Sequence, residues 1–362
     1  MQKIRVIALY LPQFHPIPEN DLWWGKGFTE WTNVGKAKSL FRGHYQPRVP
    51  ADLGYYDLRL PEVRQAQADL AQEYGVEGFC YWHYWFASGK KLLERPFSEV
   101  LLSGKPDFPF CLGWANHSWK GKYSGVNNKN ALIEQQYNGV EEYATHFYEV
   151  LPAFKDKRYI TVDGKPFFLI FDPEFQDAPV FIDCWQKLAV DNGLPGIHFV
   201  AHTYQSGRIP ALLKAGFDAV NVVRLFDYQR VGISLLQQVI NKIKREVFNT
   251  GFYPEYRDAM RFFSGEEDAE PHVYPTVVPD WDHSPRTGAY GSILKNASPE
   301  LFGKHLARTF NDVKTKPQQQ RIVIIKSWNE WGEGNYMEPD LKFGRKYLDA
   351  LKKAIENVAG EP

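Results

Sequence analysis

The sequence has little cysteine, no excess of either charge and no long apolar run, and each absence excludes a class of protein. Its three cysteines, Cys80, Cys111 and Cys184, cannot all be paired in disulfide bonds. Cys80 and Cys111 lie inside apolar, strand-like stretches, where a buried reduced thiol is the usual state. A disulfide-stabilised secreted domain is therefore not expected, and reduced thiols favour the cytoplasm.

Lys and Arg together number 43, and so do Asp and Glu, which gives a formal net charge of zero. A protein without a basic surplus is not expected to bind nucleic acid. The sequence contains no stretch of 18 apolar residues that would predict a transmembrane segment. Its first residues, MQKIRVIALYLPQF, lead into a strand and do not have the pattern of a signal peptide. The sequence therefore predicts a cytoplasmic protein that does not cross a membrane, and it indicates no oligomeric state.

Cofactor motifs are also absent. The first apolar stretch is followed by PQFHP (residues 12–16) and not by the glycine-rich turn that binds a dinucleotide. The sequence contains no His-x-His or His-Glu-x-x-His pattern for a metal and no serine elbow. We expect neither a metal nor an organic cofactor, although histidines near predicted strand ends leave a metal site as an alternative hypothesis.

What the chain does contain is an alternation of short apolar runs with longer helical patterns. Eight such pairs predict a parallel sheet closed into a single (β/α)8 TIM barrel that spans residues 1–362, with long βα loops. An open doubly wound sheet is the competing architecture. Insertions are expected at about residues 12–57, 117–136 and 249–272. The eight predicted strands are residues 4–11, 78–86, 108–116, 167–172, 198–203, 219–225, 273–278 and 322–327.

The stretch RIVIIKSWNEWGEGNYMEPD (residues 321–340) passes directly from a buried strand to a cluster of carboxylates and indoles. Glu330 and Glu333 follow the carboxyl end of this strand, which is where α/β barrels place their chemistry. Two close carboxyl groups repel when both are ionised, so their pKa values should separate into an acid and a base. The alternative is that both are loop charges and the tryptophans are core.

Aromatic, amide and carboxyl residues occur near most predicted strand ends. Aromatic faces stack on sugar rings and the polar groups bind hydroxyls, so these residues suit a neutral oligo- or polysaccharide. The alternatives are that the aromatic runs pack in the core and that Asp280 and Asp282 hold loops. The candidate binding residues are Tyr10, His15, Trp31, Tyr81, His83, Trp85, Trp114, Asn116, His202, Tyr204, Asp280, Trp281, Asp282, Trp328 and Trp331.

A resemblance to a known family spans nearly the whole chain and is specific in six separated blocks. They resemble the WbsX-like proteins of polysaccharide gene clusters, often described as glycosyltransferases and related to glycoside hydrolase family 99. The blocks are YLPQFHPIPENDLWWGKGFTEWTNV, GHYQPRVPADLGYYDLR, GFCYWHYWF, FCLGWANHSW, DKRYITVDGKPFFLIF and SWNEWGEGNYMEPD.

The resemblance implies a barrel that acts on α-linked mannose-type or related sugars. By its match to the family's NEWGEG-like block, Glu330 is implied as the base that acts on the sugar 2-hydroxyl and gives a 1,2-anhydro intermediate. Glu333 is implied as the acid and then the base, with net retention. Tyr10 matches an active-site tyrosine of that family, and Trp114 and Asn116 are similarly placed.

Three functions follow as hypotheses. The first is a metal-independent retaining glycoside hydrolase that cleaves α-linked bonds in a bacterial surface or cell-wall polysaccharide with Glu330 and Glu333. The second is a glycosyltransferase of O-antigen or capsule biosynthesis. The third is a carbohydrate-binding protein without catalytic activity. The loops differ from those of the mannan-cleaving enzymes, so neither the sugar nor endo or exo action is implied.

Overall fold

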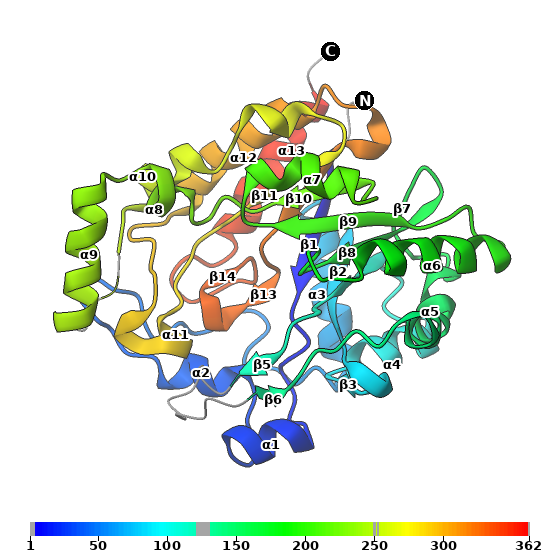
Figure 1. Cartoon of the computed structure of the whole chain (residues 1–362). Coiled ribbons are helices and arrows are strands. Elements are labelled where there is room, and N and C mark those ends of the chain that lie inside the picture. Colours follow the sequence, from blue (N-terminus) through cyan, green and yellow to red (C-terminus); the bar gives the residue numbers. More distant parts are fainter. Residues whose placement is uncertain (1–3, 121–130, 249–250, 252, 361–362) are drawn as a thin grey trace.

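The computed structural model describes residues 4–120, 131–248, 251 and 253–360. Eight parallel strands pair side by side, and the last pairs with the first, which closes the sheet into a barrel and confirms the predicted fold (Figure 1). In chain order they are β1 (Arg5–Tyr10), β2 (Gly78–Trp85), β4 (Phe110–Trp114), β8 (Lys165–Ile170), β9 (His198–Thr203), β10 (Ala219–Val222), β11 (Val273–Val277) and β12 (Ile322–Ile325).

Helices between the strands cover the outside of the barrel because each buries its apolar stripe against the sheet. Helix α12 shows the local causes well, since Ser298 caps its first turn by accepting a hydrogen bond from the Leu301 amide and Pro299 starts it. The covering helices are α3 (Pro61–Glu73), α4 (Arg95–Ser103), α5 (Val140–Phe154), α6 (Ala178–Asp191), α7 (Ile209–Lys214), α12 (Pro299–Val313) and α13 (Lys346–Ala359).

The loops after the strands hold further elements. Residues 12–57 contain α1 (Pro18–Trp24) and α2 (Glu30–Lys36), and residues 223–272 contain α8 (Asp227–Val231), α9 (Leu235–Phe248) and α10 (Tyr256–Ala259). Helix α9 stands apart from the sheet at one edge of the molecule (Figure 1). Helix α11 (Ser284–Thr287) follows β11.

Short antiparallel pairs complete the structure. Strand β3 (Lys91–Leu92) pairs with β2 and β7 (Thr161–Val162) with β8, while β13 (Asn329–Glu330) and β14 (Asn335–Tyr336) form a separate hairpin. In the predicted insertion 117–136, β5 (Trp119–Lys120) pairs with β6 (Ala131–Ile133), and residues 121–130 lie outside the described residues. Among the described residues, no helix combines the length and apolar character needed to cross a bilayer.

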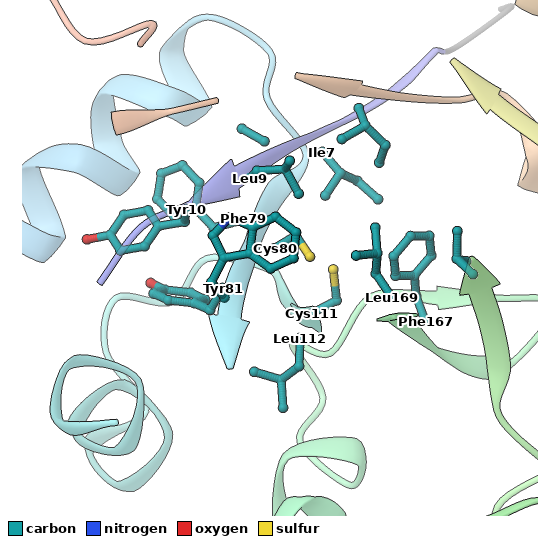
Figure 2. Close-up of a cluster of buried hydrophobic side chains, with 14 of the residues drawn as sticks. Ile7, Leu9, Tyr10, Phe79, Cys80, Tyr81, Cys111, Leu112, Phe167 and Leu169 are labelled. Atoms are coloured by element: carbon teal, nitrogen blue, oxygen red, sulfur yellow. The ribbon is translucent and has the colours of Figure 1, made fainter. Parts of the chain in front are cut away.

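Side chains of the barrel strands alternate between the interior and the helix layer. Figure 2 shows the sulfur atoms of Cys80 and Cys111 facing each other from β2 and β4, and both are free buried thiols. A Cβ atom on Gly113 would lie 3.1 Å from the Trp82 ring and 3.2 Å from the Cys80 sulfur, so this glycine leaves room for Trp82 inside the barrel. On β2, Cys80, Trp82 and Tyr84 therefore face inward.

The stretch after β12 is tied to the stretch after β1 by one side chain. Asn329 is fully buried, and its Oδ1 accepts a hydrogen bond from the Leu11 amide (2.8 Å) while its Nδ2 donates to the Leu11 carbonyl (3.0 Å). These two bonds continue the pairing of β1 with β12 beyond the end of the sheet. The Asn329 side chain thereby fixes the position of the next residue, Glu330, relative to the end of β1.

Replacing Asn329 by Leu is expected to lower the free energy of unfolding by roughly 2–4 kcal/mol, because a buried backbone donor and acceptor would both lose their partner. Urea unfolding measures the difference. The exposed Asn138, which donates to Glu142, provides the control, and its replacement by Leu should cost less than about 0.5 kcal/mol. Equal losses in the two variants would contradict this role for Asn329.

Candidate active site

Glu330 and Glu333 lie on the β13–β14 hairpin directly after β12, at the carboxyl end of the barrel strands. One turn of 3-10 helix, Trp331–Glu333, separates them, and Gly334 ends it in the left-handed conformation with a φ of 67°. Glu330 is buried and Glu333 is half-buried. The hairpin contacts α2 and α11, so two loop helices from distant parts of the chain cover it (Figure 1).

Arg286 of α11 binds three glutamates at once. Its Nη2 donates to Glu330 Oε1 (2.5 Å), its Nη1 to Glu333 Oε1 (2.6 Å) and its Nε to Glu30 Oε1 (2.9 Å). Glu30 comes from α2, where it is buried and also accepts a hydrogen bond from Asn33. We call Glu30, Arg286, Glu330 and Glu333 the carboxylate cluster.

Gly332 makes the approach of α2 possible. A Cβ atom at this position would lie only 1.8 Å from Glu30 Oε1 and 3.1 Å from Arg286 Nε. Any side chain there would collide with both groups, so the glycine between the two hairpin glutamates is required for the packing of the cluster. This is one reason for the Glu-Trp-Gly-Glu sequence of residues 330–333.

Two further basic groups face Glu333. Lys326 Nζ lies 3.4 Å from Glu333 Oε2, and it also lies over the Trp281 ring, 5.5 Å from the centroid. His283 Nε2 lies 3.8 Å from Glu333 Oε1. Glu333 therefore has more positive partners than Glu330, whose ion pair is with Arg286.

The two hairpin glutamates are electrostatically different. The pKa of Glu330 is raised to about 7, mainly by burial and also by the charge of Glu333, while Arg286 opposes the shift. Burial would also raise the pKa of Glu333, but Lys326 and Arg286 outweigh it and hold that pKa well below its usual range. In the substrate-free site Glu330 therefore holds a proton far more readily than Glu333. This order of pKa values is the opposite of the one expected if Glu333 is the acid.

A continuous set of aromatic rings follows the inner rim of the barrel beside Lys326, and we call it the aromatic arc. Neighbouring rings in it lie 5.2–5.8 Å apart, and Phe171 stacks on His202 while Trp281 stacks on His283. Several of these rings are only half-buried and so have apolar surface available to a ligand. The members are Trp82, Phe171, His202, Tyr204, Phe226, Trp281 and His283.

His202, Tyr204 and Trp281 were predicted from the sequence, and the structure brings them together in the arc. Burial, and then Lys326, lower the pKa of His202 to about 3, so its ring is neutral, and its Nδ1 is paired with Asn221 Oδ1 at 2.7 Å. The Trp281 indole donates to Ser292 Oγ (2.7 Å). Their placement agrees with a binding role, which stays a prediction.

Several other predicted binding residues face the helix layer and are corrected here. The Tyr10 hydroxyl donates to Gln67 Oε1 of α3 (2.7 Å), and its ring lies against that of Tyr81 (4.5 Å between centroids), as Figure 2 shows. Tyr81 in turn packs on Phe97 of α4. Both are buried on the outside of the strands, so neither is placed to meet a ligand at the carboxylate cluster.

His83, Trp85 and Trp114 lie on the same outer side. The rings of Trp85 and His146 of α5 stack in parallel at 4.6 Å, and His83 Nε2 lies 2.9 Å from His146 Nε2. The Trp114 indole donates to the Trp85 carbonyl (2.9 Å). The candidates from β2 lie on its outer face. The sequence did not distinguish the two faces, because aromatic residues occupy both and no polar residues alternate with them.

A cavity of about 360 Å³ lies beside β2. It lies among β2, α4 and α5, and none of the four cluster residues lines it. Its lining includes Tyr81, His83, Phe97, Leu101, Tyr148 and Pro152.

Asn116, Trp328 and Trp331 have structural partners. Asn116 joins the ends of β4 and β8, since its Nδ2 donates to the Asp172 carbonyl and its Oδ1 accepts from the Asp172 amide, both at 2.7 Å. Trp328 and Trp331 are fully buried, and Trp331 stacks on Tyr336 at 3.7 Å. We correct all three from binding residues to residues that hold the site together.

Trp31 and His15 also lie behind the site. The Trp31 ring contacts that of Trp331 (5.5 Å) and its indole donates to the Tyr56 carbonyl (2.8 Å). His15 is buried, and burial lowers its pKa although Asp57 opposes the shift. Neither residue contacts the carboxylate cluster through a described hydrogen bond or ion pair, and direct binding by either stays a prediction.

Asp280 and Asp282 bind side chains of another loop, as predicted by the alternative that these two aspartates hold loops. Asp280 pairs with Arg48 Nη2 (2.9 Å), and Asp282 Oδ2 is bonded to His44 Nε2 and Gln46 Nε2, both at 2.7 Å. The three partners belong to the 12–57 insertion. The two aspartates thus attach this insertion to the loop after β11, next to the carboxylate cluster.

The sequence interpretation missed Glu30, Arg286, Lys326, Trp82 and Tyr84. Tyr84 faces the barrel interior, where burial and then the Glu330 charge raise its pKa. Trp82 and Tyr84 could have been found from the alternation of β2 if Gly113 on the neighbouring strand had been recognised as the space for an inward indole. Glu30 and Arg286 lie 300 and 44 residues from Glu330 along the chain, and no sequence spacing joins them.

The sequence matches the family described as glycosyltransferase WbsX over residues 6–351. The chain belongs to this WbsX family. Two curated relatives from strains of Xanthomonas campestris pv. campestris, each called uncharacterized protein WxcX, are 38% identical to it over 353 and 352 residues. The alignment covers 97% of this chain and 49% of each relative, so the chain spans about half their length.

Solved structures with the same fold include glycoside hydrolases. The GH99 endo-alpha-mannosidase from Bacteroides thetaiotaomicron is 14% identical, with a TM-score of 0.60 for its complex with BIS-TRIS-propane and 0.59 for a second structure, and both alignments cover 98% of this chain and 97% of the other. A glycoside hydrolase-like protein also gives 0.60, over 98% of this chain and 94% of its own. At this identity the likeness shows that the WbsX chain shares their barrel fold.

Proposed function

We propose that this WbsX family member is a retaining glycoside hydrolase that cleaves α-linked bonds in a bacterial surface or cell-wall polysaccharide. The observation that carries the proposal is the pairing of Glu330 and Glu333 on one guanidinium at the carboxyl end of the barrel. Two carboxyl groups that flank a glycosidic bond can protonate the leaving oxygen and supply a base or nucleophile. The active chemistry needs no group beyond these side chains.

The arrangement supports retention. Retaining enzymes hold their carboxyl groups about 5 Å apart, whereas inverting enzymes keep roughly 6.5–9.5 Å to admit a water molecule. Here the two Oε1 atoms are bonded to the two terminal nitrogens of the same planar guanidinium, which favours the shorter separation.

We assign the base to Glu330 and the acid, later the base, to Glu333, following the resemblance. With this assignment, Glu333 must gain a proton and Glu330 must lose one before the first step. Since Arg286 bridges both groups in the substrate-free site, a sugar that enters between them has to separate the guanidinium from at least one carboxylate. Catalytic geometry often forms only in the substrate complex, so this rearrangement is part of the proposal.

The aromatic arc supports a sugar substrate. Ring faces offer apolar surface for the C–H faces of pyranose rings, and Lys326 and Tyr204 lie beside them as hydrogen-bonding groups. The GH99 relative is an endo-alpha-mannosidase, and we extend its substrate class to this chain only as α-linked mannose-type or related sugars.

The proposal is tested by product release from a panel of α-mannans and bacterial surface polysaccharides, with NMR used to follow the anomeric configuration of the first product. We expect the wild-type protein to release oligosaccharides with retained configuration and the Glu333→Gln variant to release almost none. Release with inversion would contradict the retaining mechanism. Equal release by both proteins would contradict the catalytic pair.

A glycosyltransferase of polysaccharide assembly is the second candidate, and the family's description favours it. A transferase of this kind would bind a sugar nucleotide, and a ligand at a hundred times its dissociation constant stabilises the folded state by about 2.7 kcal/mol. An increase of the melting temperature with a nucleotide sugar, together with no release from any polymer, would support the transferase. Binding of polymers without either activity would indicate the third hypothesis, a carbohydrate-binding protein.

A further inference from the structure

Glu338 is a further buried carboxyl group beside the hairpin, and neither the proposed catalytic pair nor the sequence interpretation uses it. It is buried behind the catalytic turn and is bonded to neutral donors from three parts of the chain. Its Oε2 accepts from the Trp331 indole (2.6 Å) and the Tyr56 hydroxyl (2.9 Å), and its Oε1 accepts from Gln67 Nε2 (2.6 Å).

This environment is unusual for a carboxyl group. Burial raises the pKa of Glu338 to about 7, although the hydrogen bonds from its donors oppose the shift. A buried acid of this kind is costly unless its hydrogen bonds are complete, so a residue without charge would be the simpler choice for packing alone. The short bonds to Glu338 therefore point to a role that needs a strong acceptor at this place.

The most consequential of its partners is Trp331. This indole stands between Glu330 and Glu333 in the sequence and forms the start of the turn that separates them. Its ring is fully buried and is stacked on Tyr336 with an interplanar angle of 12°. The hydrogen bond to Glu338 fixes the one polar atom of the ring and with it the orientation of the ring in the stack.

The other partners extend the support to neighbouring elements. Gln67 of α3 accepts a hydrogen bond from Tyr10 at the end of β1 (2.7 Å). Tyr56 accepts through its carbonyl from the indole of Trp31, the residue after Glu30 on α2. Glu338 thus joins the catalytic turn, the first barrel strand and the helix that brings Glu30 into the carboxylate cluster.

We propose that Glu338 is a positioning residue for the catalytic pair. Its carboxyl group holds the Trp331 indole, and through this ring it fixes the turn that carries Glu330 and Glu333. It touches no substrate in this assignment. The kinetic part of the inference rests on the proposed hydrolase activity, whereas the contact between Glu338 and Trp331 does not.

The contact is tested by the indole N–H signal of Trp331 in 15N-labelled protein, assigned by its absence in Trp331→Phe. We expect this signal at low field in the wild type, because its partner is a carboxyl oxygen, and a clear upfield shift in Glu338→Ala. If Glu338→Ala does not fold, Glu338→Asp serves the same purpose, since its shorter side chain withdraws the acceptor. A signal that stays in place in the variant would overturn the proposal, whatever the protein's activity.

The effect on the pair is tested by steady-state kinetics on a polymer that the wild type cleaves. In Glu338→Ala, or in Glu338→Asp, we expect kcat to fall about 100-fold with KM within about twofold, because a small displacement of catalytic groups lowers the rate without removing binding contacts. Glu338→Gln should regain most of the rate. Its carbonyl can accept from Trp331 and Tyr56, and Gln67 can turn its amide to accept from the new side-chain N–H group.

Tyr274→Phe provides the matched control, because Tyr274 is a buried residue of β11 whose hydroxyl is bonded to His198 (2.9 Å), on the opposite end of the barrel from the hairpin. It should lose stability but keep the wild-type kcat. A normal kcat in Glu338→Ala, or the same loss in Glu338→Gln as in Glu338→Ala, would overturn the positioning role. Absence of turnover in the wild type would contradict the proposed function and leave the indole measurement to decide the inference.

Discussion

Replacement of Glu333 by Gln is expected to lower the rate of polysaccharide cleavage by about 10²–10⁴-fold at pH 7, which is the range that a positioned acid or base contributes. Replacement of Glu330 by Gln should have an effect of the same size, since each group acts in the same step. Both variants keep the shape of the side chain, so a lost rate reflects the lost proton transfer. Rates are measured as new reducing ends released from the polymer.

At pH 8, only Glu333→Gln of these two variants should lose stability. The folded-state pKa of Glu333 is lowered, so its ionisation stabilises the protein above the unfolded pKa, and Glu333→Gln should unfold more easily at pH 8. The folded-state pKa of Glu330 is raised to about 7, so its stabilising contribution is lost as pH rises from about 4.5 to 7. Glu330→Gln should therefore be as stable as the wild type at pH 8, or more stable.

Glu267→Gln is a suitable control for both variants, because Glu267 is bonded to Arg224 in another loop. It should leave the rate of cleavage unchanged. Cleavage at wild-type rates by Glu330→Gln and Glu333→Gln would exclude the pair as the catalytic groups. A stability loss of equal size in both variants would contradict the electrostatic difference between them.

Replacement of Arg286 by Gln is expected to lower the free energy of unfolding by about 3–5 kcal/mol at pH 7, the cost of removing one partner from a buried ion pair. Without the guanidinium, Glu30, Glu330 and Glu333 repel each other, and Lys326 and His283 face only Glu333 among them. The loss should be smaller at pH 5. Arg286 lowers the pKa of both hairpin glutamates, so without it both pKa values rise and the folded variant binds more protons than the wild type between pH 5 and 8.

Urea unfolding at pH 5, 6, 7 and 8 measures this dependence. Arg224→Gln is the matched control, since Arg224 is a buried arginine that binds Asp268 (2.7 Å) and Glu267 (2.7 Å) away from the carboxylate cluster. We expect the control to be destabilised but to cleave the polymer at the wild-type rate, whereas Arg286→Gln should lose both stability and rate. If the loss of unfolding free energy in Arg286→Gln does not become smaller as pH falls, the proposed electrostatic role of Arg286 in the carboxylate cluster would be contradicted.

The barrel and the pair of glutamates after its last strand were accessible from the sequence because their signals are local. Strand β12 is a run of β-branched residues between charges, and the hairpin that follows it brings Glu330 and Glu333 together within four residues. Strand order also follows, since eight alternating units that are joined by helices can close in one way only. These features need no information about contacts between distant residues.

The binding residues were less accessible because a buried strand does not show which of its faces is inside. In β2, Tyr81 and Trp82 have similar burial and chemistry, and only the space left by Gly113 on the adjacent strand admits Trp82 to the interior. Similarly, Trp331 has an indole that could stack on a sugar ring, but Glu338 and Tyr336 bury it. Residue type alone does not separate a ring that binds a ligand from one that packs.

By itself, the sequence determined the alternation of strands and helices, the barrel and the acidic turn after its last strand, because hydrophobic period and short-range spacing encode them. Only the tertiary structure decided which residues meet that turn. Glu30 and Arg286 reach Glu330 and Glu333 from loops after β1 and β11, and Glu338 reaches Gln67 of α3. Such contacts depend on how loops fold back over the barrel rim, and this depends on packing across the whole molecule.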